Sequence, residues 1–309
     1  MDRHKIIVNP VSGRGKALAD IPRVESLLRT LGVPFDLVRT ERPLHAVSLA
    51  RAAAAEGYGV VVAMGGDGTA NEVLNGLMQA RQEGSGTAAM GILAVGRGND
   101  FADGIGVPHG LEPSSRVLAA GKRRRIDVGK VYGGLFPEGR FFGNGIGVGF
   151  DAVVGLEAAK LTWLSGFACY LVAALKTIFL YFHAPLLAIR YDGGTLEQPA
   201  LMVSVMNGRR MGGTFHMAPQ SEIDDGRFTV CLAGAVSRLG IFFLIPRFIQ
   251  GTQAGHPAIR FFDTAQISVH ALRGSLTAHA DGETICTRGE TLRAEILPQA
   301  IDVVCSEKD

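Results

Sequence analysis

A glycine-rich turn between an apolar run and a helical stretch limits the folds open to this chain. The apolar run Val60–Met64 is followed by Gly65-Gly66-Asp67-Gly68-Thr69-Ala70-Asn71, and an amphipathic stretch then continues to Gln82. Glycines let the backbone approach another group closely, and a helix N-terminus offers unpaired N–H groups to an anion. In open α/β sheets, ligands bind beyond the carboxyl ends of strands. The turn therefore predicts an α/β fold with a phosphate site; a plain turn in which Asp67 only caps the helix is the alternative.

The first half of the chain alternates short apolar runs with amphipathic stretches. This order of strand and helix predicts a parallel sheet with helices on both faces. We expect strands at Lys5–Val8, Phe35–Val38, Val60–Met64 and Ile92–Val95, and helices at Lys16–Leu31, His45–Glu56 and Asn71–Gln82.

From about residue 125 strands follow one another with few helices between them, which predicts mainly antiparallel β structure. A length of 309 residues favours two domains. We therefore predict an α/β domain over residues 1–125 and a mainly antiparallel β-sandwich domain with helical insertions over residues 126–309. The last strand, Ile301–Cys305, fits either domain. The other expected elements are strands at Leu201–Met206, Arg227–Leu232, Gln266–His270 and Leu292–Ile296 and helical insertions at Phe150–Phe182 and Arg238–Gly251.

Composition excludes several classes of protein. Hydrophobic residues make up 47% of the chain and charged residues 19%, so disorder is not expected. A formal charge of +2 is too small for a nucleic-acid footprint, and we expect no nucleic-acid partner. The basic run Lys122–Arg125 is interpreted as a solvated loop, with a phosphate or lipid-headgroup contact as the alternative.

The cysteines and the apolar segments indicate a protein of the cytoplasm. The four cysteines form no CxxC pair, which favours a reducing compartment over zinc or a disulfide framework. The apolar run Ile6–Val8 is too short for an export signal. Lys176 and Pro185 interrupt the apolar segment Leu161–Ile189, so we expect a buried helix followed by a strand there and no membrane span.

Two further loops rich in glycine and Asn or Asp follow expected strands. Asn9–Lys16 follows the first strand but is no P-loop, because Pro10 and Ala17 stand where Walker A needs Gly and Ser or Thr. Gly96–Phe101 follows the fourth strand, and no complete GxGxxG fingerprint occurs. Since the carboxyl ends of parallel strands share one edge of a sheet, the three loops predict a nucleotide site there.

Together these motifs resemble the diacylglycerol-kinase catalytic-domain family. The likeness rests on Asn9-Pro10-x-Ser12-Gly13, on GGDGTxNEVxNG at 65–76 and on Gly98-Asn99-Asp100-Phe101-Ala102, and it continues through Gly145–Ala152, Asp224–Gly226 and Asp281–Glu283. Bacterial soluble lipid kinases are the most similar members, with sphingosine and ceramide kinases as relatives. The resemblance implies an α/β nucleotide domain, a β-sandwich domain, the cofactors ATP and Mg²⁺, and transfer of the ATP γ-phosphate to a lipid hydroxyl.

The resemblance also implies roles for individual residues in the nucleotide domain. Asp67 and Asp100 would serve catalytic Mg²⁺, although Asp100 could simply be a helix cap. The family usually has Thr where this chain has Arg97, which puts that nucleotide contact in question, although an Arg could pair with a phosphate. The expected ATP-binding residues are Asn9, Pro10, Val11, Ser12, Gly13, Thr40, Gly65, Gly66, Asp67, Gly68, Thr69, Ala70, Asn71 and Arg97.

In the second domain the resemblance points to two groups of acidic residues. It places the acid–base carboxylates at Asp281-Gly282-Glu283, and the sequence does not choose between Asp281 and Glu283 as the proton acceptor; an exposed turn is the alternative. It also implies a structural Mg²⁺ site at Asp225 with Glu222 and Arg227, the last two through backbone oxygens, where an ordinary turn is the alternative.

Two other functions stay open from the sequence. GGDGT also fits NAD kinases, and the departure at Arg97 is compatible with a catalytically weak nucleotide or lipid sensor. For a lipid kinase we expect a membrane lipid as substrate and peripheral contact with the inner membrane surface through Leu161–Phe182 or Phe242–Ile245. The lipid acceptor and the oligomeric state, a homodimer included, are left undecided.

Overall fold

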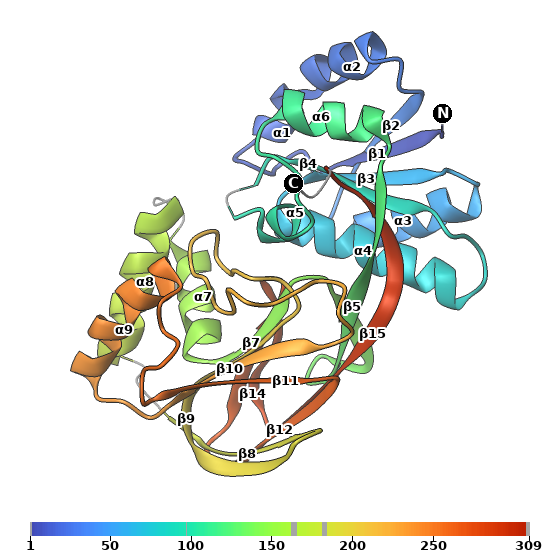
Figure 1. Cartoon of the computed structure of the whole chain (residues 1–309). Coiled ribbons are helices and arrows are strands. Elements are labelled where there is room, and N and C mark those ends of the chain that lie inside the picture. Colours follow the sequence, from blue (N-terminus) through green and yellow to red (C-terminus); the bar gives the residue numbers. More distant parts are fainter. Residues whose placement is uncertain (1, 97, 162–165, 181–183, 307–309) are drawn as a thin grey trace. The chain divides into compact units, whose positions relative to one another are not determined.

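The computed structural model describes residues 2–96, 98–161, 166–180 and 184–306 (Figure 1). The chain forms two compact units. Unit 1 consists of Met1–Ile126 and Gln299–Asp309, and unit 2 consists of Asp127–Pro298. The chain passes from one unit to the other within two strands, β5 (Arg123–Gly133) and β15 (Thr291–Val304).

Unit 1 is built on a parallel sheet in the order β4-β3-β1-β2, and Val303 of β15 lies beside Met90 of β4, also in parallel. The predicted parallel sheet is confirmed. The strands are β1 (His4–Val8), β2 (Phe35–Arg39), β3 (Val60–Gly65) and β4 (Ala89–Ala94), and the helices are α1 (Lys16–Ala19), α2 (Ile21–Thr30), α3 (His45–Ala55), α4 (Asp67–Gln82), α5 (Asp100–Gly104) and α6 (Leu111–Ala120).

Helices cover both faces of this sheet (Figure 1). On one face, side chains of β1 and β3 pack with Val24 and Leu28 of α2 and with Leu118 of α6 in a buried cluster. On the other face α3 and α4 touch closely, since a Cβ on Gly76 would stand 2.3 Å from the Val47 carbonyl oxygen. Both faces of a parallel sheet must be covered because its strands are apolar on both sides.

Unit 2 is a sandwich of antiparallel strands, as predicted. One layer runs β14-β13-β7-β9-β10-β11, and the other contains β8 and β12, which pair with β9 and β15. Their inward side chains form one large apolar cluster. The strands are β6 (Phe136–Phe142), β7 (Gly145–Gly149), β8 (Leu186–Tyr191), β9 (Gly194–Met206), β10 (Phe228–Gly234), β11 (Ile259–Thr264), β12 (Gln266–Arg273), β13 (Leu276–Ala280) and β14 (Glu283–Gly289), with helices α7 (Phe150–Lys160), α8 (Gly166–Leu180) and α9 (Arg238–Gln250).

Two predicted helix bounds were wrong in unit 1. The helix expected over Lys16–Leu31 is divided at Asp20, and Pro22 lies in the first turn of α2, where its missing N–H does no harm. The helix expected from Asn71 begins at Asp67, because the glycine-rich turn itself forms the first helical turn.

Unit 2 and β15 differ from the prediction in a similar way. The single helical insertion expected over 150–182 contains two helices, α7 and α8, and residues 162–165 and 181–183 lie outside the described part. The two strands expected at 292–296 and 301–305 are one continuous strand, β15. Among the residues that the structure describes, no helix is long and apolar enough to cross a bilayer.

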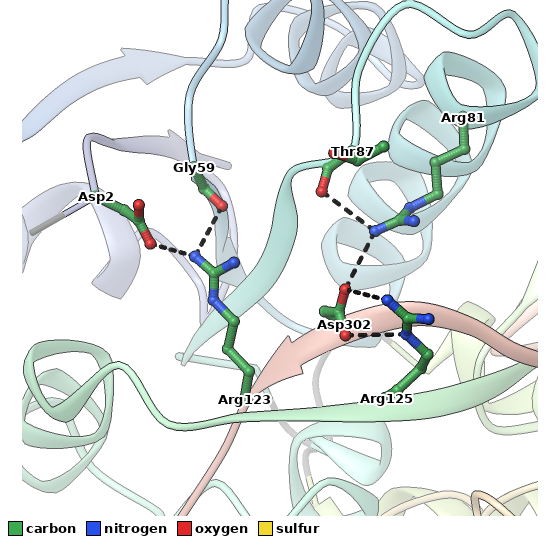
Figure 2. Close-up of polar contacts among 7 residues, drawn as sticks. All are labelled: Asp2, Gly59, Arg81, Thr87, Arg123, Arg125 and Asp302. Atoms are coloured by element: carbon green, nitrogen blue, oxygen red, sulfur yellow. Dashed lines mark hydrogen bonds and ion pairs between the residues drawn. The ribbon is translucent and has the colours of Figure 1, made fainter.

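The basic run is largely exposed, as predicted, but most of it belongs to strand β5 and not to a loop, and two of its arginines make ion pairs (Figure 2). Arg123 pairs with Asp2 and donates to the Gly59 carbonyl oxygen at 3.3 Å. Arg125 donates to both carboxylate oxygens of Asp302, at 3.2 and 3.3 Å. Arg123 and Arg125 therefore tie β5 to the other parts of unit 1.

Candidate active site

The structure brings the three glycine-rich loops of unit 1 together. Asn9 Nδ2 donates to Thr69 Oγ1 at 3.1 Å, which joins the first loop to the second. A Cβ on Gly13 would stand 2.6 Å from the Val95 carbonyl oxygen, so the first loop also lies against the third. The loops meet because they follow β1, β3 and β4, neighbouring parallel strands whose carboxyl ends share an edge.

Asp67 connects the second loop to the third. Its carboxylate accepts the Asn99 N–H at 2.7 Å and the Phe101 N–H at 3.2 Å. Asn99 has a left-handed backbone conformation and exchanges side-chain hydrogen bonds with Gly96. The Asp67 carboxylate is therefore fixed beside the N-terminus of α4. Hard oxygen donors of this kind fit Mg²⁺.

The glycines of the second and third loops serve different purposes. A Cβ on Gly65 would stand 2.4 Å from Thr69 Oγ1, and one on Gly96 would stand 2.3 Å from Gly66 Cα. These glycines are needed for packing within the loops. A Cβ on Gly68, by contrast, would meet nothing within 4 Å. Gly68 therefore borders open space at the N-terminus of α4, where a phosphate can approach the backbone.

Part of the GGDGT motif's continuation is structural, which the sequence reasoning missed. Glu72 accepts the Leu44 N–H at 3.1 Å and the Ala46 N–H at 3.0 Å, and so caps the N-terminus of α3. Asn75 donates to the backbone and side-chain oxygens of the buried Asn71. The signal for these roles was weak, because polar residues such as Glu72 and Asn75 are expected in an amphipathic stretch.

The remaining predicted residues of the nucleotide site lie in the same unit. Thr40 is buried directly after β2, and its N–H donates to the Val8 carbonyl oxygen at 2.8 Å. Asp100 is buried as the first residue of α5, beside the amides that bind Asp67. Arg97 lies outside the described residues.

In unit 2 the carboxylate of Asp281 is held by backbone amides. It accepts the N–H groups of Gly143 at 2.7 Å, Asn144 at 3.0 Å and Gly145 at 2.9 Å. Asp281 has a positive φ of 46°, which non-glycine residues rarely adopt. These hydrogen bonds favour the ionised carboxylate and stabilise the unusual backbone conformation.

Glu283 has a different environment. Its Oε2 accepts a hydrogen bond of 2.7 Å from Nε of Arg140, whose side chain is buried, while the Glu283 side chain remains partly exposed. The guanidinium orients the carboxylate without enclosing it. The two predicted acid–base residues thus differ in their partners, which are backbone amides for Asp281 and the Arg140 guanidinium for Glu283.

The predicted metal-binding residues surround the turn before β10. Arg227 N–H donates to Asp225 Oδ1 at 2.9 Å, and Gly226 N–H donates to Asp127 Oδ2 at 2.6 Å. Loss of water raises the pKa of Asp225, and the carboxylates of Asp127, Asp263 and Glu222 raise it further. A cation would offset this repulsion, so the donor set fits Mg²⁺. No three His, Cys, Asp or Glu side chains converge as metal ligands in the part of the chain described, so backbone oxygens or water would complete the coordination.

Unit 2 also holds a polar cluster to which we had assigned no role. Ser204 Oγ donates to Asp151 Oδ2 at 3.0 Å, and the Ala152 N–H donates to Asp151 Oδ1 at 2.8 Å. Desolvation by burial raises the pKa of Asp151 to about 7 and lowers the pKa of His279 to about 4. Both side chains reach the point where a Cβ on Gly147 would stand.

Comparison with known families agrees with this geometry. Residues 3–131 match the diacylglycerol kinase catalytic domain, and residues 144–305 match the YegS C-terminal NAD kinase beta sandwich-like domain. The chain belongs to the diacylglycerol kinase family. The resemblance expected from the motifs is confirmed, and the family is one of phosphotransferases.

Individual relatives are distant but extend over almost the whole chain. A Staphylococcus aureus (strain bovine RF122 / ET3-1) protein named diacylglycerol kinase is 27% identical over 282 residues, which cover 91% of this chain and 86% of that protein. The structure of a diacylglycerol kinase from Bacillus anthracis str. Sterne has a TM-score of 0.75 at 19% identity and covers 99% of this chain and 97% of that one. Yeast NADH kinase has a TM-score of 0.50 at 13% identity, covering 100% of this chain and 84% of that one, which shows a shared fold alone.

Proposed function

We propose that this member of the diacylglycerol kinase family transfers the γ-phosphate of ATP to the hydroxyl of a lipid such as diacylglycerol, with Mg²⁺. The observation that carries the proposal is the convergence of the three loops on Asp67 and the open N-terminus of α4. Helix N-termini and close-approaching glycine backbones bind phosphates, and a carboxylate beside them suits a metal that bridges phosphate oxygens.

Glu283 is proposed as the acceptor of the lipid hydroxyl's proton. Asp281 is the weaker candidate, because three N–H donors already stabilise its charge and occupy its oxygens. Glu283 has one guanidinium partner and keeps free acceptor capacity at a partly exposed carboxylate. Arg140 would hold it in the orientation that proton transfer needs.

Two places are proposed for Mg²⁺. Asp67, with Asp100 nearby, would hold the ion that accompanies ATP, and Asp225 with Glu222 and the backbone of Arg227 would hold a second ion that supports the turn. Bound Mg²⁺ supplies neutralisation of the charge that develops on the phosphate oxygens. The protein's own part is to orient these carboxylates, and at Asp225 the cation would offset the repulsion from neighbouring carboxylates.

The enzyme is proposed to reach its lipid at the inner membrane surface through α8 and α9. Phe179 of α8 is 61% exposed, and Leu239 and Phe243 of α9 are 71% and 75% exposed. We call these three residues the apolar patch; α8 and α9 touch, with the rings of Phe179 and Phe242 6.1 Å apart. In the predicted membrane contact Phe242–Ile245, Phe243 is the exposed residue. Leu244 is buried, and Phe242 and Ile245 are partly buried. Exposed aromatic and aliphatic side chains on amphipathic helices suit a bilayer surface.

The test is phosphate transfer from labelled ATP and Mg²⁺ to diacylglycerol, phosphatidylglycerol, a sphingoid base, ceramide and NAD. The proposal expects one labelled lipid, and loss of the label in Asp67→Asn and Glu283→Gln. Chelation of Mg²⁺ should also abolish transfer. Labelled NAD would show an NAD kinase, and ATP binding without any transfer would favour a sensor; either result would overturn the proposal.

A further inference from the structure

The hairpin that carries Glu283 has a histidine hydrogen-bonded to its turn. Strands β13 and β14 are joined by Asp281 and Gly282, whose φ angles of 46° and 82° suit a tight two-residue turn. Within this turn the Gly282 N–H donates to Nδ1 of His279 at 3.3 Å. The turn is thus held from two sides, by the amides that bind the Asp281 carboxylate and by the imidazole that binds the Gly282 amide.

This hydrogen bond sets the protonation of the ring. A neutral imidazole has one N–H group and one acceptor nitrogen. Because Nδ1 of His279 accepts the amide hydrogen, its proton must lie on Nε2. Loss of water lowers the pKa of His279 to about 4, so the ring stays neutral, and able to accept, at neutral pH.

The far edge of the ring is confined by a row of residues across three strands. His279 of β13 lies opposite Gly147 of β7, and Gly147 lies opposite Ser204 of β9. His279 Nε2 lies 2.6 Å, and Asp151 Oδ2 2.4 Å, from the point where a Cβ on Gly147 would stand. Only glycine leaves room for both side chains there. Asp151 is itself held by Ser204 and the Ala152 amide, so its carboxylate limits the ring on this side.

We propose that His279 is a positioning residue, which places Glu283 by accepting the Gly282 N–H. The inference rests on the proposed function, in which Glu283 takes the proton from the lipid hydroxyl. Glu283 directly follows Gly282 and pairs with Ala280 at the closed end of the hairpin, so movement of the turn moves its carboxylate. A displacement of about 1 Å of a reacting group can cost on the order of 100-fold in rate.

The test compares substitutions of His279 that keep or remove a hydrogen-bond acceptor for the Gly282 N–H. His279→Leu removes it and should lower kcat about 100-fold while the KM for ATP stays within about twofold, because ATP is assigned to unit 1. His279→Gln and His279→Asn offer an amide oxygen, and at least one should recover kcat to within about threefold of wild type. His270→Leu is the matched control, since this histidine bonds to Thr291 Oγ1 in the same sandwich and should leave kcat unchanged.

A second variant covers the case in which His279→Leu does not fold. Gly147→Ala, whose added Cβ would displace His279 Nε2, should also lower kcat with little change in the KM for ATP. Imidazole ¹⁵N shifts should show the Nε2–H tautomer. Slow exchange of the Gly282 amide hydrogen should be retained in His279→Gln and lost in His279→Leu.

The outcomes separate this inference from the proposed function. An active wild type together with a folded His279→Leu variant of equal kcat would overturn the positioning role alone. The opposite tautomer, with the proton on Nδ1, would do the same. A wild type that phosphorylates no lipid overturns the proposed function and the positioning role with it.

Discussion

Three carboxylates among the candidate functional residues, one in unit 1 and two in unit 2, have different hydrogen-bond partners. Asp67 accepts two backbone amides of a neighbouring loop, and Asp281 accepts three at a turn. Glu283 accepts a guanidinium and remains partly exposed. At the scale of single residues these partners, more than the residue type, are the basis of the roles that we propose: loop support for Asp67, turn support for Asp281 and proton transfer for Glu283.

Gly68→Ala should impair ATP use without destabilising the fold. A Cβ at this position meets nothing within 4 Å in the folded chain, and alanine favours the helix by up to about 1 kcal/mol. If a phosphate approaches the Gly68 backbone, the methyl group should raise the KM for ATP about tenfold or more. Gly155→Ala in α7 is the control, because its Cβ also meets nothing and it is remote in sequence from the loops. Equal KM values for the two variants would contradict phosphate binding at Gly68.

Asp281→Asn and Glu283→Gln should fail in different ways. Asn cannot keep all three charge-assisted hydrogen bonds, so we expect a loss of about 3 kcal/mol in the free energy of unfolding. Gln keeps an acceptor for the buried Arg140 but removes its countercharge, so Glu283→Gln should lose about 1–2 kcal/mol and lower kcat about 100-fold or more. Urea unfolding and transfer assays measure the two effects. The reverse pattern would assign the proton acceptor to Asp281.

Asp151→Asn should alter the pH dependence of stability. The pKa of Asp151 is about 7 in the folded chain against 3.8 as its ordinary value, so between these values only the folded state holds the proton. The free energy of unfolding contributed by this group therefore falls as pH rises from about 4 to about 7, by up to ~1.4 kcal/mol per pH unit. The free energy of unfolding of the variant minus that of wild type should therefore increase from about pH 4 to about pH 7 and be constant above it.

Urea unfolding of both proteins at several pH values measures this difference. Comparison with wild type is needed because His279, whose pKa is lowered from 6.5 to about 4, acts in the opposite direction: its contribution to stability rises with pH across that range. That contribution is common to both proteins and cancels in the difference. A difference that is constant from pH 4 to 8 would show that the Asp151 carboxyl is not desolvated.

At the scale of elements, helices α8 and α9 bury one side and expose another. Ile241, Leu244 and Phe248 of α9 are buried in an apolar cluster with Ile178 of α8. The apolar patch lies on the same two helices but outside this core. A helix needs only one apolar side to pack in a water-soluble domain, so the patch requires a separate explanation, which we propose is the lipid surface.

The double substitution Leu239→Ser/Phe243→Ser should weaken binding to anionic vesicles. Each side chain is expected to contribute about 1.5–3 kcal/mol when it enters an apolar environment. The double variant should therefore bind the vesicles about 100-fold more weakly, or weaker still. Sedimentation with phosphatidylglycerol vesicles measures it. Leu272→Ser on β12 is the control, because Leu272 is also exposed but belongs to another element. Equal vesicle binding by wild type and the double variant would remove the patch as the docking surface.

At the scale of the whole molecule, β5 and β15 carry the chain between the units, and charged contacts anchor both strands in unit 1. Arg125 from β5 and Arg81 from α4 both pair with Asp302 of β15, and Arg81 also donates to the Thr87 carbonyl oxygen at 3.2 Å (Figure 2). One carboxylate thus holds two arginines and joins three segments distant in sequence.

Asp302→Asn should lower the free energy of unfolding of unit 1 by about 1–2 kcal/mol, because it leaves two guanidinium groups facing each other without a countercharge. The partial exposure of these side chains limits the effect. Glu112→Gln is the control, since its pair with Arg116 is an exposed contact within one helix and should contribute about 0.5 kcal/mol or less. Equal losses in the two variants, measured by urea unfolding, would contradict an anchoring role for Asp302.

The local pattern of the chain was enough to predict much of this protein. Apolar runs alternating with amphipathic stretches predicted the parallel sheet of unit 1, and the glycine-rich turns predicted three loops at one edge of it, because strand direction decides where their ends lie. The motifs also predicted the family. The bounds of α1, α2 and α4 were missed, since a proline and a glycine-rich first turn alter a helix without changing its apolar period.

Contacts between distant residues were decided only by the tertiary structure. The sequence shows Asp281 and Glu283 as equal neighbours, and they differ because the Gly143–Gly145 amides surround one and Arg140 orients the other. It shows His279 as one histidine in a strand, and only strand register sets it opposite Gly147 and beside Asp151. The physical reason is that a pattern in sequence reports burial and backbone preference, whereas hydrogen bonding and desolvation depend on which side chains the fold brings together.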